Sequence, residues 1–361
     1  MDKYSVAVIE SIPDWEKTHE QWNNLLAKSK SNNIFLTFEW LFSWWNIFLN
    51  DRKKLSILYI YNRNILVGIA PWYIHSIKHG PFKQKRFEFI GSPEAGSDYL
   101  DVICTEGEEI NISHILYKYI HNGFKKWDSL YFSDFPANSM FFMNFIHELN
   151  NDGKYYVLKT ASYCPTINLP NDIEEYKSSM TSKRKKKLDW QIHKLNQKGK
   201  ITTDNIICNG IDNLIDDYFD FYELVRNINN DKLRYFVKYY HKYLGNKSTI
   251  QIITLKQDEI KLASILHLLY GKIKYNYLVA TNKNYDKSIS VGEILVYECI
   301  NNSIKEKYNK YDFLKGEEQY KFKWSNDGER SLSLLYYKFG FLTFYLLFIE
   351  TIKNMAKYIL R

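Results

Sequence analysis

Residues Leu55–Ile74 read LSILYIYNRNILVGIAPWYI, and residues Ile250–Leu269 read IQIITLKQDEIKLASILHLL. Each stretch is an apolar strand followed by a polar turn and a second apolar run. This order predicts a β-hairpin in both places. The same local structure is therefore expected twice in one chain, far apart in the sequence.

The segments around the two hairpins also correspond. An aromatic-rich helical segment precedes each hairpin, EWLFSWWNIF at Glu39–Phe48 and RYFVKYYHKY at Arg234–Tyr243. A strand that ends in polar or acidic residues follows each one, KKWDSLYFSD at Lys125–Asp134 and NKYDFLKGEE at Asn309–Glu318. The repeated order of helix, hairpin, helix and strand predicts two copies of one α/β domain.

Each copy is long enough to be a domain rather than a solenoid repeat. We expect an N-terminal domain over residues 1–162 and a C-terminal domain over residues 163–361. The stretch Tyr163–Asp172 contains two prolines and is predicted to be the crossover between them. The second domain is expected to contain a basic helix at residues 182–200 and a closing helix at residues 341–360.

Charge, cysteine spacing and the length of apolar runs indicate which partners and which cellular compartment to expect. Lys and Arg number 49 against 41 Asp and Glu in 361 residues, a net charge of +8 that favours anionic partners. The four cysteines lack metal-ligand spacing, which indicates a reducing compartment without a zinc site. The apolar run Phe339–Ile349 is too short to cross a bilayer. We expect a soluble, cytoplasmic protein with no metal and no DNA partner, and the basic last helix leaves peripheral membrane contact open.

The first candidate site is the junction LVATNKNYDKSISVGEILVYECI at Leu278–Ile300. A strand runs into a loop that opens an amphipathic helix, and free N–H groups at a helix start bind phosphates. Ser288, Ser290, Val291 and Gly292 are the candidate cofactor contacts. Simple N-capping by Ser290 is the structural alternative, and the loop is neither a Walker A nor a GxGxxG motif.

The second candidate is YDFLKGEEQYKFKWSND at Tyr311–Asp327. A strand that ends in glycine and clustered ionisable residues is typical of the rim of a ligand cleft in an α/β sheet. The candidate residues of this segment are Lys315, Glu317, Glu318, Tyr320, Lys321 and Trp324.

The third candidate is the most basic stretch of the chain, at Ser178–Lys200. Cations at the N-terminal end of a helix oppose its dipole, so local stability does not explain them. Lys183, Arg184 and Lys185 are predicted to bind an anion, with a solvated basic face as the alternative. In SDYLDVI, Asp98 and Tyr99 are a further candidate substrate contact, although turn formation explains this segment equally well.

Five segments in order give a more specific indication. They are FLTFEWLFSWWNIF (Phe35–Phe48), VGIAPWYI (Val67–Ile74), GSDYLDVI (Gly96–Ile103), SKRKKKLDWQIHKL (Ser182–Leu195) and DFLKGEEQYKFKW (Asp312–Trp324). Together they resemble the CelD/BcsL-like acyltransferases linked to cellulose and cell-surface polysaccharide biosynthesis. Those proteins carry two tandem domains of the GCN5-related N-acetyltransferase (GNAT) type and are similar to the Fem peptidyltransferases.

The resemblance implies two GNAT-like domains, each a mixed, mostly antiparallel sheet flanked by helices. It also implies transfer of an acyl group from acetyl-CoA or another acyl-CoA to an amine or hydroxyl of a sugar or cell-envelope precursor. The Arg/Gln-x-x-Gly-x-Gly/Ala loop of single-domain acetyltransferases is missing, and Ser288–Gly292 occupies its place with one glycine. The richer cleft rim places the active site in the second copy.

For this reaction we expect Glu317 to act as the base, with Glu318 as an alternate, and Tyr320 as the proton donor. Lys315 and Lys321 would hold anionic groups, and the basic helix would meet a nucleotide-sugar or phosphorylated acceptor. Two alternatives stay open: Fem-like transfer from aminoacyl-tRNA, and a non-catalytic module of a polysaccharide-synthesis complex. The sequence leaves open the acceptor, the acyl chain length and the oligomeric state.

Overall fold

The computed structural model describes residues 4–124, 127–208, 212–244, 249–340 and 343–345. By their contacts these residues form two compact units. Unit 1 comprises Met1–Ala161 together with the chain from Arg330 onward, and unit 2 comprises Ser162–Glu329. The expected closing helix at residues 341–360 lies outside the described residues, apart from residues 343–345.

Unit 1 contains two groups of strands and the helices that cover them. Its elements are β1 (Tyr4–Ile9), α1 (Ile12–Glu16), α2 (His19–Leu26), η1 (Ile34–Leu36), α3 (Phe38–Phe48), β2 (Lys53–Leu55), β3 (Ile57–Asn62), β4 (Ile65–Ala70), β5 (Trp72–His79), β6 (Phe82–Phe89), β7 (Ile103–Cys104), α4 (Glu109–Lys118), η2 (Tyr119–Gly123), β8 (Ser129–Pro136) and α5 (Met140–Asn151). Strands β9 (Tyr156–Asn168) and β15 (Asp327–Tyr337) each contain residues of both units.

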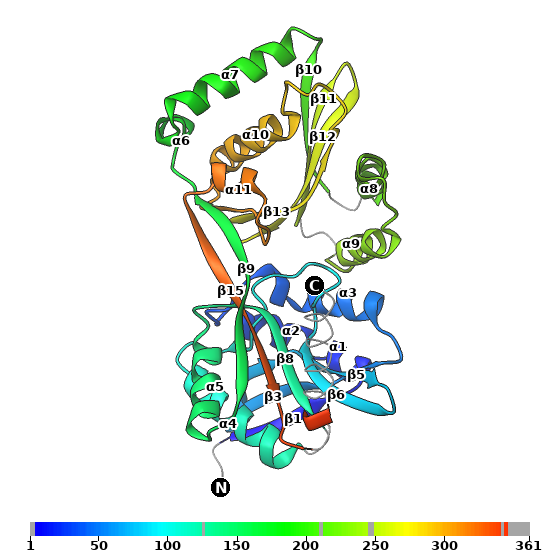
Figure 1. Ribbon diagram of the computed structural model, residues 1–361, viewed down its shortest axis with the longest axis vertical. Coiled ribbons are helices and arrows are strands. Elements are labelled where there is room, and N and C mark those ends of the chain that lie inside the picture. Colours follow the sequence, from blue (N-terminus) through cyan, green and yellow to red (C-terminus); the bar gives the residue numbers. More distant parts are fainter. Residues whose placement is uncertain (1–3, 125–126, 209–211, 245–248, 341–342, 346–361) are drawn as a thin grey trace, which may run out of the picture. The chain divides into compact units, whose positions relative to one another are not determined.

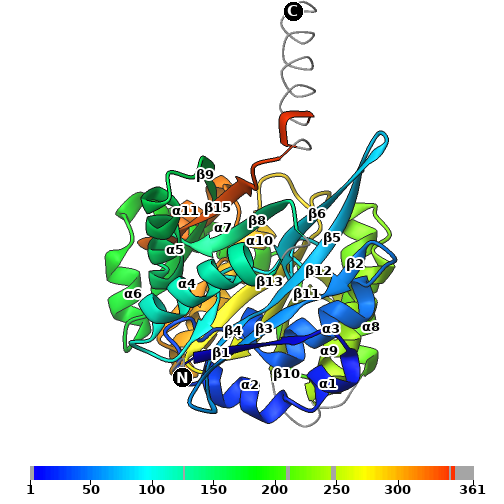
Figure 2. The same cartoon turned by 90° about the horizontal axis from the view of Figure 1, so that it is seen from below.

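The antiparallel sheet β1-β3-β4-β7 is buried on both faces. On one face Trp22 of α2 packs against Tyr59, with ring centroids 6.2 Å apart. On the other face Ile112 of α4 lies so close to Gly68 that a Cβ there would be 2.9 Å from its Cδ1. Figure 2 shows these helices on either side of the sheet. A second group of strands, β2-β5-β6-β8-β15, is antiparallel except for the parallel pair β6–β8.

Unit 2 is built around the strands β10-β11-β12-β13-β14 and the second half of β9. Its remaining elements are α6 (Ile173–Ser179), α7 (Ser182–Asn196), β10 (Ile201–Ile207), α8 (Asp212–Arg226), α9 (Asp231–Leu244), β11 (Ile250–Gln257), β12 (Ile260–Tyr270), β13 (Ile273–Thr281), α10 (Val291–Lys305), β14 (Lys310–Asp312) and α11 (Gln319–Trp324). The strands pair antiparallel except for β13 and β14, which are parallel.

Helix α10 is the central helix of unit 2. It lies on β11, β12 and β13, and α6 and α7 pack against it, whereas α8 and α9 lie on the other side of the sheet (Figure 1). Its buried side chains include Leu295, Cys299 and Ile300, which join the apolar residues of the strands in one core. Leu188 and Leu195 of α7 belong to the same core, so the basic helix is amphipathic.

The same order of elements recurs in the two units. In unit 1, strand β1 is followed by helices α1 to α3 and the hairpin β3–β4; in unit 2, β10 is followed by α8, α9 and the hairpin β11–β12. The first strand pairs antiparallel with the first hairpin strand in both. A helix and a further strand follow, α4 and β8 in one unit and α10 and β14 in the other. The expected fold, two mixed and mostly antiparallel sheets flanked by helices, is confirmed.

The stretch Tyr163–Asp172, expected to be the crossover between the domains, begins just after the division of the two units between Ala161 and Ser162, but most of it is strand. Strand β9 continues to Asn168, and its residues Thr166–Asn168 pair with β14. Proline cannot donate a backbone hydrogen bond, but the carbonyl of Pro165 accepts one from the N–H of Phe313 at 3.0 Å. The strand therefore tolerates Pro165.

Candidate functional site

The parallel strands β13 and β14 run together only briefly. Their pairing covers three positions, from Ile273 opposite Lys310 to Tyr275 opposite Asp312. Strand β14 then ends, while β13 continues to Thr281 and keeps β12 on its other edge. Beyond Tyr275 no described strand pairs with this edge of β13, and such an edge presents backbone N–H and C=O groups that another extended chain could bind.

One carbonyl on this edge carries a side chain from α8. Arg226 donates to the oxygen of Val279 from Nε at 3.3 Å and from Nη2 at 3.0 Å. The N–H of Asn282 bonds to the carbonyl of Leu262, and hydrogen-bonded pairs alternate along an antiparallel ladder. The carbonyl of Val279 therefore points away from β12, toward the edge that β14 leaves. Nothing in the sequence indicated this role for Arg226.

Helix α10 begins directly after the loop that follows β13. Its N-cap residue, Ser290, makes no side-chain capping hydrogen bond, so the capping alternative is wrong. Ser288 instead donates its hydroxyl hydrogen to Asp286 and accepts from Lys194 of α7, both at 2.5 Å. Lys198 bonds to the same aspartate at 2.7 Å, and this hydrogen bond is the main reason why the pKa of Asp286 is lowered. The loop is thus tied to the basic helix.

Two further candidates of this junction have structural roles. Val291 is buried, 2% exposed, in the core under α10. A Cβ at Gly292 would lie 3.2 Å from the Oγ1 of Thr281. The single glycine therefore allows α10 to approach β13 closely, and its predicted contact with a cofactor is a separate role.

The loop after β14 holds the candidate base and its neighbours. Glu317 and Glu318 are exposed, and Glu318 pairs with Lys321 at 3.0 Å. The Nζ of Lys321, whose side chain is 7% exposed, also donates to the carbonyls of Lys315 at 2.8 Å and Leu314 at 3.3 Å. Lys321 therefore fixes the conformation of the loop, and Glu317 is the carboxylate that this arrangement leaves at the surface.

Tyr320 is the second residue of α11, the helix that follows this loop. Its ring packs at the edge of the unit 2 core, 6.5 Å from the ring of Phe313. Burial, with a smaller contribution from Glu318, raises the pKa of Tyr320 to about 12. The phenol therefore keeps its proton at neutral pH.

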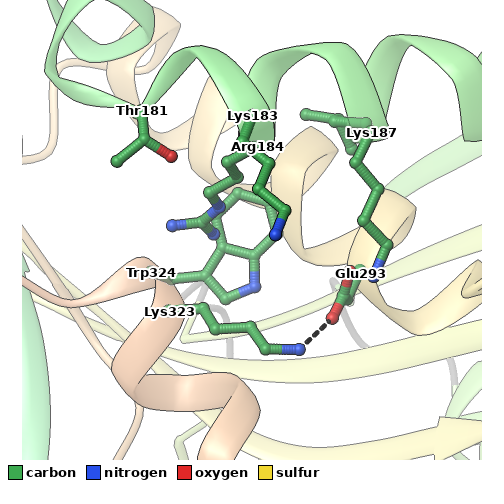
Figure 3. A pocket seen from close by; sticks show the side chains of 8 residues that line it. Thr181, Lys183, Arg184, Lys187, Glu293, Lys323 and Trp324 are labelled. Carbon is green, nitrogen blue, oxygen red and sulfur yellow. Dashed lines mark hydrogen bonds and ion pairs between the residues drawn. The ribbon is translucent and has the colours of Figure 1, made fainter.

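A cavity of about 230 Å³ lies between α7, α10 and α11 (Figure 3). Three candidates from two separate parts of the sequence meet there, the neighbours Lys183 and Arg184 and the distant Trp324. The remaining lining residues are Thr181, Lys187, Leu188, Glu293 and Lys323. Lys185 is half-buried on the same helix and is not among them.

The sequence analysis missed three charged residues of this cavity. Lys187 follows Lys183 by four residues, which places both on one helix face and could have identified it. Glu293 and Lys323, which form an ion pair of 2.8 Å, come from two other helices and had no local signal. They are brought to the basic helix by the packing of unit 2.

The candidates Asp98 and Tyr99 lie in unit 1 and are buried, 1% and 7% exposed. Their neighbour Asp101 lines a separate cavity with Ser31 and Ser139, and both hydroxyls donate to its carboxylate. Burial raises the pKa of Asp101 to about 7, against the lowering effect of these hydrogen bonds. A substrate contact by Asp98 or Tyr99 stays a prediction.

Unit 2 also buries a histidine in its core. His267 of β12 is 0% exposed, and its Nε2 lies 2.9 Å from the hydroxyl of Tyr311. Burial, followed by the charge of Lys274, lowers the pKa of His267 well below its usual value. His267 is thus a core residue of an apolar strand.

This burial predicts a pH dependence of stability. The unfolded chain takes up a proton on His267 below about pH 6.5, whereas the folded chain does not until the pH falls much lower. Stability should therefore fall by about 1.4 kcal/mol per pH unit below pH 6.5 through this residue. Urea unfolding at pH 7 and pH 5 would measure the loss in wild type and in His267→Gln. An equal loss in both proteins would contradict the assignment.

The described residues contain no group of three or more His, Cys, Asp or Glu side chains placed to hold a metal ion. No helix in the described part of the chain has the length and apolar character needed to span a membrane.

Comparison with known proteins adds to this geometry. Residues 182–322 match a sequence family described as acetyltransferase (GNAT) domain. A sequence search of curated proteins finds no match. The matched residues include the basic helix, the open edge of β13, α10 and the loop with Glu317.

Solved structures match nearly the whole chain. FemX is 10% identical with a TM-score of 0.57, covering 92% of this chain and 97% of its own. A conserved protein of unknown function from Bacteroides thetaiotaomicron is 14% identical with a TM-score of 0.55, covering 92% and 100%. L-PGS from Bacillus licheniformis is 12% identical with a TM-score of 0.52, covering 91% and 95%. At such identities the similarity establishes the fold alone. With the sequence match, it follows that the chain carries a GNAT-type acetyltransferase domain in unit 2 and is an acyltransferase.

Proposed function

We propose that the chain transfers an acyl group, acetyl being the simplest, from acyl-CoA to an amine or hydroxyl of a small acceptor in the cytoplasm. Unit 2, within the expected C-terminal domain, is the proposed catalytic part. The observation that supports this most is the parting of β13 from β14 beside the start of α10. Amide groups of an extended donor complement an open strand edge, and phosphates favour a helix N-terminus.

The donor contacts follow from this placement. The backbone at Ser290, Val291 and Gly292 would face the donor phosphates, with Ser288 and Lys315 beside them. Arg226 has to release the carbonyl of Val279 if the donor pairs with that part of the edge. This requirement makes Arg226 a residue that changes partner when the donor binds.

The chemistry needs a base and a hydrogen-bond donor for the leaving sulfur. The acceptor nitrogen or oxygen attacks the thioester carbon, the new C–N or C–O bond forms, and the C–S bond breaks. Glu317 takes the proton of the acceptor, with Glu318 as the alternate, and the thiolate leaves as the thiol after protonation. A phenol with a pKa of about 12 is a weak acid, so Tyr320 would stabilise the sulfur mainly as a hydrogen-bond donor.

The acceptor is proposed to be a sugar or cell-envelope precursor, because the chain resembles CelD/BcsL-like acyltransferases. Lys183, Arg184 and Lys185 would meet its anionic part, and Trp324 lies beside them. Lys321 would act through the loop that it holds, since its Nζ bonds to that loop.

Calorimetry tests whether the donor binds, and we expect acetyl-CoA to bind the wild-type chain. A thiol assay tests the reaction: with an amino sugar present, free thiol should be released in proportion to the acetylated product. Thiol release that does not depend on the amino sugar would contradict transfer to it. Failure to bind acetyl-CoA would contradict the proposal as a whole.

A second function is favoured by the similarity to FemX and by the exposed lysines of α7, such as Lys186 and Lys187. These features would suit Fem-like transfer from aminoacyl-tRNA, because a basic helix attracts a polyanion. A charged tRNA in the same calorimetry distinguishes the two donors. Binding of neither donor would favour a non-catalytic module.

A further inference from the structure

The cavity between α7, α10 and α11 has an excess of positive charge. Four of its lining residues are cationic, namely Lys183, Arg184, Lys187 and Lys323, and Glu293 is the one carboxylate among the lining residues that the structure describes. Glu293 is already paired with Lys323 at 2.8 Å. Three cationic side chains therefore surround a small space with no lining carboxylate left to balance them.

Two buried N–H donors in this cavity have no acceptor among the described residues. Trp324 is 4% exposed, and its Nε1 makes no hydrogen bond. The Nη2 of Arg184 is also buried without a partner, and the guanidinium lies over the indole, 3.8 Å from the ring centroid. Figure 3 shows the indole nitrogen facing the side where Lys183, Lys323 and Glu293 lie. A buried donor left without an acceptor destabilises the folded state, so a ligand that supplies acceptors is favoured here.

We propose that this cavity binds a phosphate monoester. Such a group carries a charge of about −1.5 to −2 at pH 7 and three acceptor oxygens, enough for the indole N–H, the guanidinium and one ammonium group. Arginine held flat against an aromatic ring is already oriented for this contact. The volume of about 230 Å³ is below the range of about 300–1,000 Å³ for whole-ligand pockets. The cavity thus fits one end of a ligand.

The phosphate monoester could belong to the donor, as the 3′-phosphate of coenzyme A, or to a phosphorylated acceptor. Only this choice of source rests on the proposed function. The cavity itself is defined by Arg184, Trp324 and the surrounding lysines, whatever reaction unit 2 carries out.

The direct test observes the indole N–H in the wild-type protein. In a ¹⁵N-tryptophan spectrum, the signal assigned to Trp324 by its loss in Trp324→Phe should shift when inorganic phosphate replaces chloride at equal ionic strength. Trp190, which is 51% exposed on α7, the helix that carries Arg184, does not line the cavity and supplies the control signal. A Trp324 signal that does not move, or moves only as much as that of Trp190, overturns the proposal.

Calorimetry then identifies the source. Acetyl-CoA is compared with 3′-dephospho-acetyl-CoA, and glucosamine 6-phosphate with glucosamine, in Lys183→Gln and in the control Lys186→Gln. The phosphorylated probe whose phosphate occupies the cavity should bind about tenfold more tightly than the same molecule without that phosphate. Lys183→Gln should remove most of this preference, whereas Lys186→Gln should keep it. Failure of acetyl-CoA to bind contradicts the proposed function but leaves the phosphate signal of Trp324 to decide this inference. No preference for either phosphorylated probe overturns it.

Discussion

Replacing Glu317 by glutamine is expected to lower kcat by about 10²–10⁴-fold, the usual contribution of a general base. An amine or hydroxyl attacks a thioester well only as it loses its proton, and glutamine cannot accept one. Glu317 is exposed at the end of the loop that Lys321 holds in place. The substitution should therefore leave the melting temperature close to that of the wild type.

Two further variants make this result specific. Glu318→Gln tests the alternate base, whose carboxylate is already paired with Lys321 at 3.0 Å. Glu174→Gln removes another exposed carboxylate of unit 2, 77% exposed, on α6. Wild-type kcat in Glu317→Gln would exclude Glu317 as the base, and a large loss in Glu318→Gln alone would transfer the role.

Replacing Glu306 by glutamine is expected to destabilise unit 2 by about 3–5 kcal/mol, because it leaves a buried ammonium group without its counter-ion. Lys274 of β13 has a side chain that is 0% exposed and pairs with Glu306 at 2.5 Å. Burial lowers the pKa of Lys274 despite this partner. Burial alone would raise the pKa of Glu306, but the hydrogen bond and charge of Lys274 outweigh it and lower that pKa.

Urea unfolding measures the effect, with Asp217→Asn as the control. Asp217 pairs with Lys261 at 2.5 Å, but its side chain is 64% exposed, so its loss should cost no more than about 1 kcal/mol. Without Glu306 the pKa of Lys274 falls further in the folded state. The unfolded state then binds more protons, so the stability of Glu306→Gln should rise from pH 7 to pH 9 more than that of the wild type. Equal losses in Glu306→Gln and Asp217→Asn would contradict the buried-pair assignment.

Several features of the fold could be read from the sequence because they depend on local pattern. The hairpins at β3–β4 and β11–β12 alternate apolar runs with polar turns, and the structure has them within a few residues of the expected places. In α7, Leu188 and Leu195 are seven residues apart, so the sequence itself places them on one helix face, and this face is the buried one. The prolines of Tyr163–Asp172 did not reveal that strand β9 runs through Pro165, which needs no donor there because its carbonyl is the group that accepts a hydrogen bond.

The candidate site likewise has some features that could be read from the sequence and others that depend on tertiary packing. By itself the sequence determined that two related sheet-and-helix units are present, where the cationic helix lies, and which loop after a strand carries clustered carboxylates. Only the tertiary structure decided that Arg184 stacks on Trp324, that Arg226 reaches the carbonyl of Val279, and that Lys321 holds its own loop. Periodicity and turn chemistry act between near neighbours and can be read along a chain. A contact between residues 140 positions apart depends on how helices pack on a sheet, and this is set by the volume and shape of the whole core.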